Sequence, residues 1–117
     1  MGRRSRRRRG AAAAPVETTE VPVGDGVITL RDELSEGTLR KLADLDARAA
    51  TSAEDRWQRR VEFLFERFVV RWEIAGLPLE GQGELLGRFR LAGSDERREV
   101  TQVLEEHLRL RHPEAGA

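Results

Sequence analysis

The longest amphipathic pattern in the sequence covers residues 56–73, which include both tryptophans and three of the four phenylalanines. Its main apolar line recurs at helical intervals and consists of Trp57, Val61, Leu64, Phe65, Phe68, Val69 and Trp72. Phe63, Val70 and Ile74 form a second, shorter line. We therefore expect a central helix over residues 53–74. Its second apolar side either is covered within the domain or offers a partner a surface of the helix-in-groove kind.

Three shorter amphipathic patterns predict further helices, over residues 36–50, 82–91 and 94–111. The first follows Ser35, whose side-chain oxygen can accept a free backbone N–H at the helix start. The last stops before Pro113, which cannot continue a helix. The apolar residues expected to face the core are Leu39, Leu42, Leu45 and Ala49 in the first, Leu85, Leu86 and Phe89 in the second, and Val100, Val103, Leu104 and Leu108 in the third.

Residues 16–31 predict a β-hairpin ahead of the helices. β-Branched residues flank a Gly-Asp-Gly sequence at residues 24–26, which is a strong turn signal, and Pro22 belongs on a sheet edge because it has no amide hydrogen. After the central helix, Gly76 can adopt the left-handed conformation that ends a helix, and Pro78 cannot continue one. The fold class we expect is mainly α, a small bundle of three to four helices with an N-terminal β-hairpin.

The chain of 117 residues is long enough for one small domain with a modest core. We expect that domain over residues 16–112, between an Arg-rich arm over residues 1–15 and a short tail over residues 113–117. The arm is expected to be disordered, because its like charges repel one another and bury nothing. The arm has the charge of a signal peptide but no apolar core of sufficient length, so no export signal is expected.

The formal net charge of zero conceals a strong asymmetry. Removing the six arginines of the arm from the 21 basic residues leaves 15 against 21 acidic ones, a net charge of −6. The arm could therefore neutralise phosphates in a nucleic acid, without sequence recognition because no aromatic residue is interleaved for stacking. The alternatives are a solvated tail and a tail docked on an acidic protein. The arm residues are Arg3, Arg4, Arg6, Arg7, Arg8 and Arg9.

The sequence offers few residues for catalysis or for metal binding. It contains no tyrosine and no cysteine, and the absence of cysteine excludes disulfides and thiolate zinc sites. His107 and His112 are five residues apart, so they do not share a helix face as a metal-binding pair at i, i+4 does. We therefore expect no catalytic residues, no cofactor and no metal. No apolar run approaches the roughly 20 residues of a membrane helix, and a cytoplasmic protein of a bacterial host is expected.

A further pattern is carried by Val69-Val70-Arg71-Trp72-Glu73-Ile74, then Leu77-Pro78-Leu79 and Glu84-Leu85-Leu86. Together with a predicted strand reading VITLR at residues 27–31, it resembles the phage tail assembly chaperones of actinobacterial phages and prophages. In that family a hairpin is followed by two helices, the second ending in an aliphatic pair, one residue and tryptophan, and then by a Leu-Pro loop and a short helix. The resemblance covers about residues 21–91. The Arg-rich arm is not part of the family pattern, and the loop after Trp72 is shorter than usual.

The resemblance implies a non-enzymatic protein that binds the tape measure protein during tail assembly. Trp72 and its neighbours would then lie in the core or face the partner, and the candidate partner-binding residues are Phe63, Val70, Trp72 and Ile74. The competing hypothesis is a small nucleic-acid-associated or virion structural protein that uses the arm. The sequence leaves open whether the chain forms a homo-oligomer.

Overall fold

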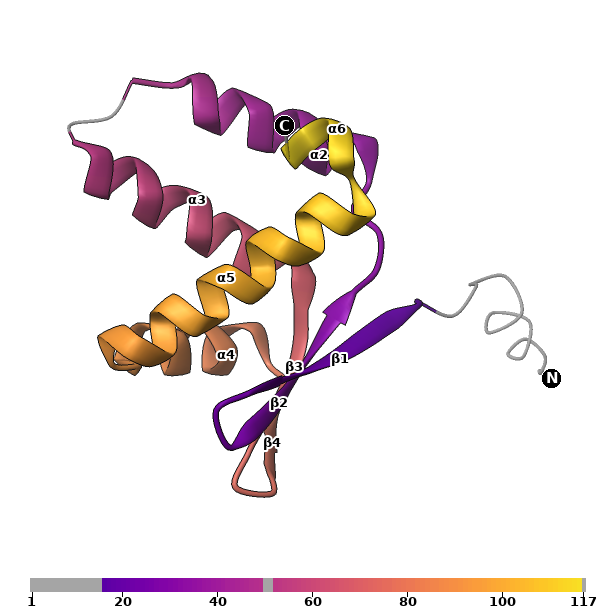
Figure 1. Ribbon diagram of the computed structural model, residues 1–117, viewed down its shortest axis with the longest axis vertical. Coiled ribbons are helices and arrows are strands. Elements are labelled where there is room, and N and C mark those ends of the chain that lie inside the picture. Colours follow the sequence, from indigo (N-terminus) through magenta and orange to yellow (C-terminus); the bar gives the residue numbers. More distant parts are fainter. Residues whose placement is uncertain (1–15, 50–51, 117) are drawn as a thin grey trace, which may run out of the picture.

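Four strands form one antiparallel sheet, in the order β1-β2-β3-β4, in the computed structural model, which describes residues 16–49 and 52–116 (Figure 1). The strands are β1 (Thr18–Val23), β2 (Gly26–Arg31), β3 (Val69–Ile74) and β4 (Leu77–Leu79). The helices are α2 (Glu36–Ala47), α3 (Ala53–Phe68), α4 (Gln82–Leu91), α5 (Ser94–Arg111) and α6 (Pro113–Gly116). The Arg-rich arm over residues 1–15 lies outside the described residues, so its expected disorder stays a prediction.

The expected helical bundle is wrong, because the protein has an α+β fold. The central helix α3 ends at Phe68, and Val69 is already extended, with φ −81° and ψ 121°. Residues 69–74 are rich in β-branched and aromatic side chains, and they pair with β2 on one side and β4 on the other. Val69 and Trp72 are three residues apart, which is a helical interval, and both are buried in the strand because a β-bulge at Val70 shifts the alternation between them.

The turn between β3 and β4 explains Gly76. Ala75 has φ 53° and Gly76 has φ 79°, and Ile74 pairs with Leu77 across them. Two residues with positive φ are the mark of a type I′ hairpin turn, whose twist suits the flanking strands. Gly76 thus takes the left-handed conformation expected of it, but in a hairpin and not at the end of a helix.

The N-terminal hairpin expected within residues 16–31 is present as β1 and β2, and it belongs to the larger sheet. Val23 pairs with Gly26 across a two-residue turn in which Gly24 has φ 55°. Pro22 lies on β1, an edge strand, as expected.

The helix boundaries follow local signals closely. The side chain of Ser35 accepts the N–H of Thr38 at the start of α2, and that of Ser52 accepts the N–H of Asp55 at the start of α3. α4 and α5 have the predicted bounds, whereas α2 ends three residues early, at Ala47. Residues 113–116, expected to be a tail, form α6, and Ala115 packs against the core.

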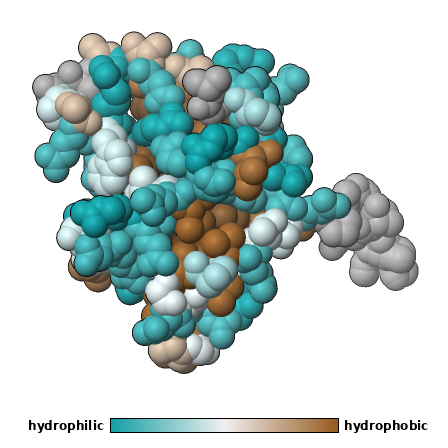
Figure 2. All heavy atoms as spheres, in the orientation of Figure 1, coloured by the Kyte–Doolittle hydropathy of each residue, from teal (hydrophilic) through white to brown (hydrophobic). Residues whose placement is uncertain are grey.

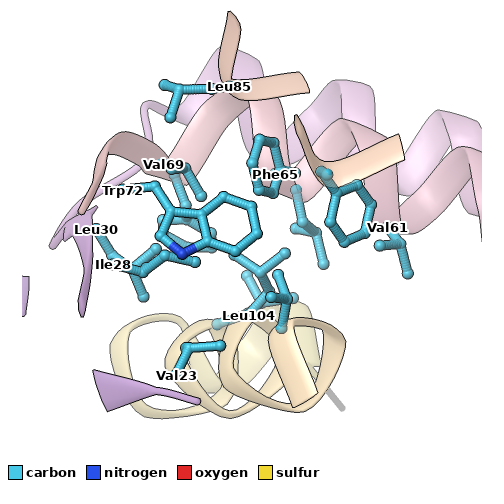
Figure 3. Packing of buried hydrophobic residues seen from close by; sticks show 14 of the residues in the cluster. Val23, Ile28, Leu30, Val61, Phe65, Val69, Trp72, Leu85 and Leu104 are labelled. Carbon is cyan, nitrogen blue, oxygen red and sulfur yellow. The ribbon is translucent and has the colours of Figure 1, made fainter. Parts of the chain in front are cut away.

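The core lies between the sheet and the helices α3, α4 and α5. Trp72 is fully buried, and Figure 3 shows its indole ring among Ile28 and Leu30 of β2, Phe65 of α3 and Leu104 of α5. The ring centroids of Phe65 and Trp72 are 6.0 Å apart in an edge-on arrangement, a favourable geometry for an aromatic pair. The helices therefore cover one face of the sheet, as is usual for an antiparallel sheet with one solvated face.

Candidate functional site

A groove of about 650 Å³ lies between the edge strand β1 and the helix α5. Thr19 and Val21 of β1 line one side, and Val103, His107 and Leu110 of α5 line the other. Figure 2 shows hydrophobic residues open to solvent at the centre of this face, beneath α5 and beside β1. Leu110 is 69% exposed. A contiguous apolar hollow of this kind on a charged protein marks a surface for a partner or a ligand.

Helix α5 lines the groove because it carries two apolar lines. The line buried in the core consists of Val100, Leu104 and Leu108. The second line turns toward β1 and consists of Val103, His107 and Leu110, spaced by four and three residues. Residues spaced in this way share one side of a helix, so α5 serves the core and the groove at the same time.

The alternation of β1 directs its odd-numbered residues into the groove. Val21 pairs with Ile28, whose side chain is fully buried, and paired residues point to the same face of a sheet. Thr19 and Val21 therefore face the helices, whereas Glu20 between them faces the open side of the sheet. Both sides of the groove are thus fixed by regular secondary structure.

The imidazole of His107 joins the floor of the groove to the core. It is 6% exposed, it lies edge-on to Phe68 with ring centroids 4.9 Å apart, and its Nε2 is 2.7 Å from the carbonyl oxygen of Arg31. A carbonyl oxygen can only accept, so Nε2 carries the proton of this hydrogen bond. His107 thereby ties α5 to the end of β2.

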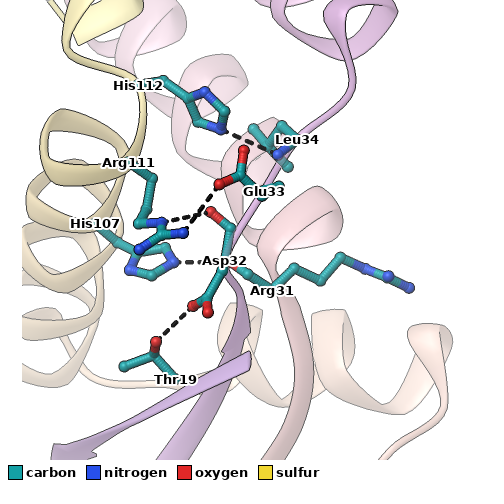
Figure 4. Close-up of polar contacts among 8 residues, drawn as sticks. All are labelled: Thr19, Arg31, Asp32, Glu33, Leu34, His107, Arg111 and His112. Atoms are coloured by element: carbon teal, nitrogen blue, oxygen red, sulfur yellow. Dashed lines mark hydrogen bonds and ion pairs between the residues drawn. The ribbon is translucent and has the colours of Figure 1, made fainter. Parts of the chain in front are cut away.

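Three more polar contacts hold the connection between β2 and α2 against the end of α5, and a fourth joins it to β1 (Figure 4). The N–H of Leu34 donates to Nε2 of His112 at 3.0 Å. Arg111 donates to the carbonyl oxygen of Asp32 at 3.0 Å and pairs with Glu33 at 2.9 Å. The hydroxyl of Thr19 donates to the carboxylate of Asp32. His112, which the sequence placed just outside the last helix, therefore has a structural role in a buried position.

Several other polar groups of the groove are engaged in the fold. The hydroxyl of Thr101 donates to the carbonyl oxygen of Arg97 at 2.7 Å. Glu105 pairs with Arg60, and Glu106 pairs with Arg109. Among residues 16–49 and 52–116, no three His, Asp or Glu side chains are grouped so that they could hold a metal ion. The chemistry that the groove offers is apolar contact within a rim of charged side chains.

The ionisable groups with shifted pKa values lie in ion pairs between helices. Two hydrogen bonds from Arg60 to Glu105, at 2.7 and 2.9 Å, raise the pKa of Arg60, and Asp46 adds to this effect. On the opposite side of α3, a hydrogen-bonded pair with Arg90 lowers the pKa of Glu62. These pairs join α3 to α2, α5 and α4, so their shifted values reflect the assembly of the helices.

The four partner-binding residues expected from the sequence do not form one surface. Trp72 is fully buried, so in this fold it is a core residue and cannot contact a partner. Phe63 is partly buried beneath the guanidinium of Arg67, which lies 4.8 Å from the ring centroid. Val70 is the unpaired residue of a β-bulge opposite β2, and Ile74 packs at the edge of the core. A role of Phe63, Val70 and Ile74 in binding stays a prediction.

The sequence of the last helix contains a second apolar line, which the expectation of one core-facing stripe did not include. Val103 was expected on the core stripe of α5, and Leu110 fits no position on that stripe. The line through Val103, His107 and Leu110 is visible in the sequence. Its pairing with β1, about 80 residues earlier in the chain, is not, because it depends on the fold.

Comparisons of the chain with protein-family models, with curated proteins and with solved structures find no match. Within the described ranges 16–49 and 52–116, no helix has the length and apolar character needed to cross a membrane. The groove and the residues around it are therefore the basis for a functional proposal.

Proposed function

We propose that the chain is a non-enzymatic protein-binding module and that it acts as a phage or prophage tail assembly chaperone in the cytoplasm of the bacterial host. The observation that carries the proposal is the apolar groove between β1 and α5, in which Val21, Val103 and Leu110 remain accessible on a highly charged surface. The family resemblance at residues 69–86 supplies the partner, a tape measure protein.

The proposed mechanism is physical. A tape measure chain is long and apolar along one side, so it aggregates unless that side is covered until tail tube subunits replace the cover. The groove offers a limited apolar area, which suits a partner that must later be released. The net charge of −6 outside the Arg-rich arm keeps the loaded complex from associating further.

Co-purification tests the proposal. The tagged full chain is isolated from its native host with nuclease treatment, and proteins recovered with it are identified. We expect one long helical protein encoded immediately downstream, recovered equally after nuclease treatment and after deletion of residues 1–15. Recovery of nucleic acid alone, lost on nuclease treatment, would contradict the proposal.

The second candidate function is a nucleic-acid-associated or virion structural protein. It is favoured by the six arginines among residues 3–9, which stand against the acidic remainder of the chain. Six phosphate contacts would make binding fall steeply with salt, about as the fifth power of salt concentration on duplex DNA. Binding of DNA that is independent of salt or of residues 1–15 would argue against this role of the arm.

A further inference from the structure

The outer edge of β1 has free backbone hydrogen-bonding positions. The N–H of Asp32 donates to the carbonyl oxygen of Glu17 at 2.9 Å, and the same register continues along β1 and β2. Hydrogen-bonded and non-bonded pairs alternate in an antiparallel ladder, so Thr19 bonds to β2 and Thr18, Glu20 and Pro22 direct their backbone groups outward. Pro22 therefore removes no bond from the sheet. Among the described residues, the outward N–H groups of Thr18 and Glu20 have no partner.

The opposite edge of the sheet is much less available. β4 has three residues, and its central residue is Pro78, which has no N–H to offer. Short edge strands and proline are common devices against pairing with another chain. β1 has six residues and borders the apolar groove, so β1 is the edge of this sheet that is suited to accept a strand.

The surroundings of β1 specify the side chains that an added strand needs. Residues of the new strand would alternate between the groove, where Val103 and Leu110 lie, and the open face of the sheet, where Glu20 lies. Glu20 is exposed and forms no ion pair with residues 16–49 or 52–116, whereas the carboxylate of Glu99, on the rim of the groove, accepts the N–H of Gly24 at 3.1 Å. Aliphatic residues suit the positions that face the groove, and basic residues suit the positions that face the open side of the sheet.

We propose that β1 and α5 bind an extended segment of the protein partner, in which aliphatic and basic residues alternate, as a fifth strand of the sheet. The inference rests on the proposed function insofar as the partner is a protein. A second copy of the chain suits the edge less well, because antiparallel pairing of two β1 strands about Glu20, whose backbone groups point outward, sets two carboxylates opposite one another. The arm of the chain itself has the charge but lacks alternating aliphatic residues to fill the groove.

The test uses the full chain, labelled for NMR, and a blocked peptide of four Arg-Val repeats. The matched control peptide has four Glu-Val repeats. On saturation with the Arg-Val peptide, amide exchange of Thr18 and Glu20 is expected to slow by about tenfold or more, because exchange then requires release of the strand. Exchange of Thr19 and Val21, which already bond to β2, changes little, while the methyl signals of Val103 and Leu110 shift.

The charge preference is tested with Glu20→Lys, an exchange at an exposed position. It should weaken binding of the Arg-Val peptide by about threefold, the expected loss of one cross-strand charge pair, and strengthen binding of the Glu-Val peptide. Equal binding of the two peptides to the original chain would overturn the charge assignment.

The remaining outcomes separate this inference from the proposed function. Shifts of Val103 and Leu110 without protection of Thr18 and Glu20 would show a ligand in the groove that is not a strand, which overturns strand addition but leaves a protein-binding groove. Absence of any shift with the Arg-Val peptide would overturn the inference, while co-purification still decides the proposed function. Concentration-dependent dimerisation that protects the same two amides without peptide would assign the edge to a second copy and overturn the inference as well.

Discussion

A β-carbon added to Gly26, at the start of β2, would lie 2.3 Å from the carbonyl oxygen of Glu73 in β3. No real β-carbon tolerates such a contact with backbone, so the two strands would have to separate. Gly26 also closes the β1–β2 turn by pairing with Val23. One glycine therefore fixes the junction between the two hairpins that build the sheet.

We accordingly expect Gly26→Ala to lower the free energy of unfolding by about 1–3 kcal/mol, the usual range for overpacking. Gly87→Ala is the matched control, since a β-carbon at Gly87 in α4 meets nothing within 4 Å. That exchange should raise stability by about 0.5–1 kcal/mol, because alanine favours the helix. Urea denaturation measures both. Equal effects of the two substitutions would contradict the strand pairing.

The two tryptophans are expected to respond very differently to truncation. Trp72 is fully buried, so Trp72→Ala should cost about 3–5 kcal/mol of stability. Trp57 is 39% exposed near the start of α3, and Trp57→Ala should cost about 1 kcal/mol or less. Denaturation curves for both variants provide the measurement. A small effect at Trp72 together with impaired partner binding would instead place this residue at an interface.

The contribution of Arg60 to stability is expected to depend on the shape of its guanidinium group as well as on its charge. It bonds to Glu105 through two nitrogens and also reaches Asp46, so it joins three helices. Lysine retains the charge but cannot form the paired hydrogen bonds, and Arg60→Lys should cost about 1–2 kcal/mol. Arg56→Lys, at an exposed position one turn earlier, is the control and should be nearly neutral. Thermal unfolding at equal ionic strength compares the two.

The pair between Glu62 and Arg90 predicts a contribution to stability that disappears in acid. The hydrogen bonds from Arg90, and then from Gln58, lower the pKa of Glu62 in the folded chain below the ordinary value of 4.5. The charged form is therefore favoured by folding. Its contribution is fully present above about pH 4.5 and is lost as the pH falls through the lower folded pKa.

The stability difference between the original chain and Glu62→Gln is expected to be constant near neutral pH and to shrink below pH 4.5. Glu20→Gln removes an exposed carboxylate without an ion pair and serves as the control, with a difference that stays near zero throughout. Urea titrations between pH 3 and pH 7, set in this range by the ordinary pKa of glutamate, measure both. A difference that grows in acid would contradict the assigned sign.

Local signals predicted the helices of this protein well. The bounds of α4 and α5, and the serines at the starts of α2 and α3, follow from residues next to the boundaries themselves. The N-terminal hairpin followed in the same way from its turn. Each of these features depends on residues that are neighbours in the sequence, so it can be predicted from the sequence alone.

β3 escaped prediction because the three-residue spacing of Val69 and Trp72 fits the helical period and conflicts with the strand period, and a β-bulge at Val70 brings both side chains into the core. The conflict is decided by pairing with β2, about 40 residues earlier, and such pairing has no local signal. Gly76 was correctly expected to be left-handed, but this conformation serves helix ends and hairpin turns equally. The error in fold class follows from this one helix-to-strand boundary at Phe68.

The groove could not be found for the same reason. Its sides, with Val21 on β1 and Val103 on α5, meet only after the sheet and the helices have assembled. The expected partner surface was based on the second apolar line of the central helix, and two of the three residues of that line, Val70 and Ile74, belong to strand β3.

Binding of the proposed partner, the tape measure protein expected from co-purification, to Leu110→Asp, with Leu91→Asp as the control, tests the central claim most directly. Leu110 is 69% exposed in the groove, and Leu91 is 85% exposed on α4 outside it, so both variants should fold. We predict a loss of affinity of about tenfold or more for Leu110→Asp, as for a residue at the centre of an interface, and unchanged affinity for Leu91→Asp. Unchanged binding by a folded Leu110→Asp variant would contradict the assignment of the groove as the partner site.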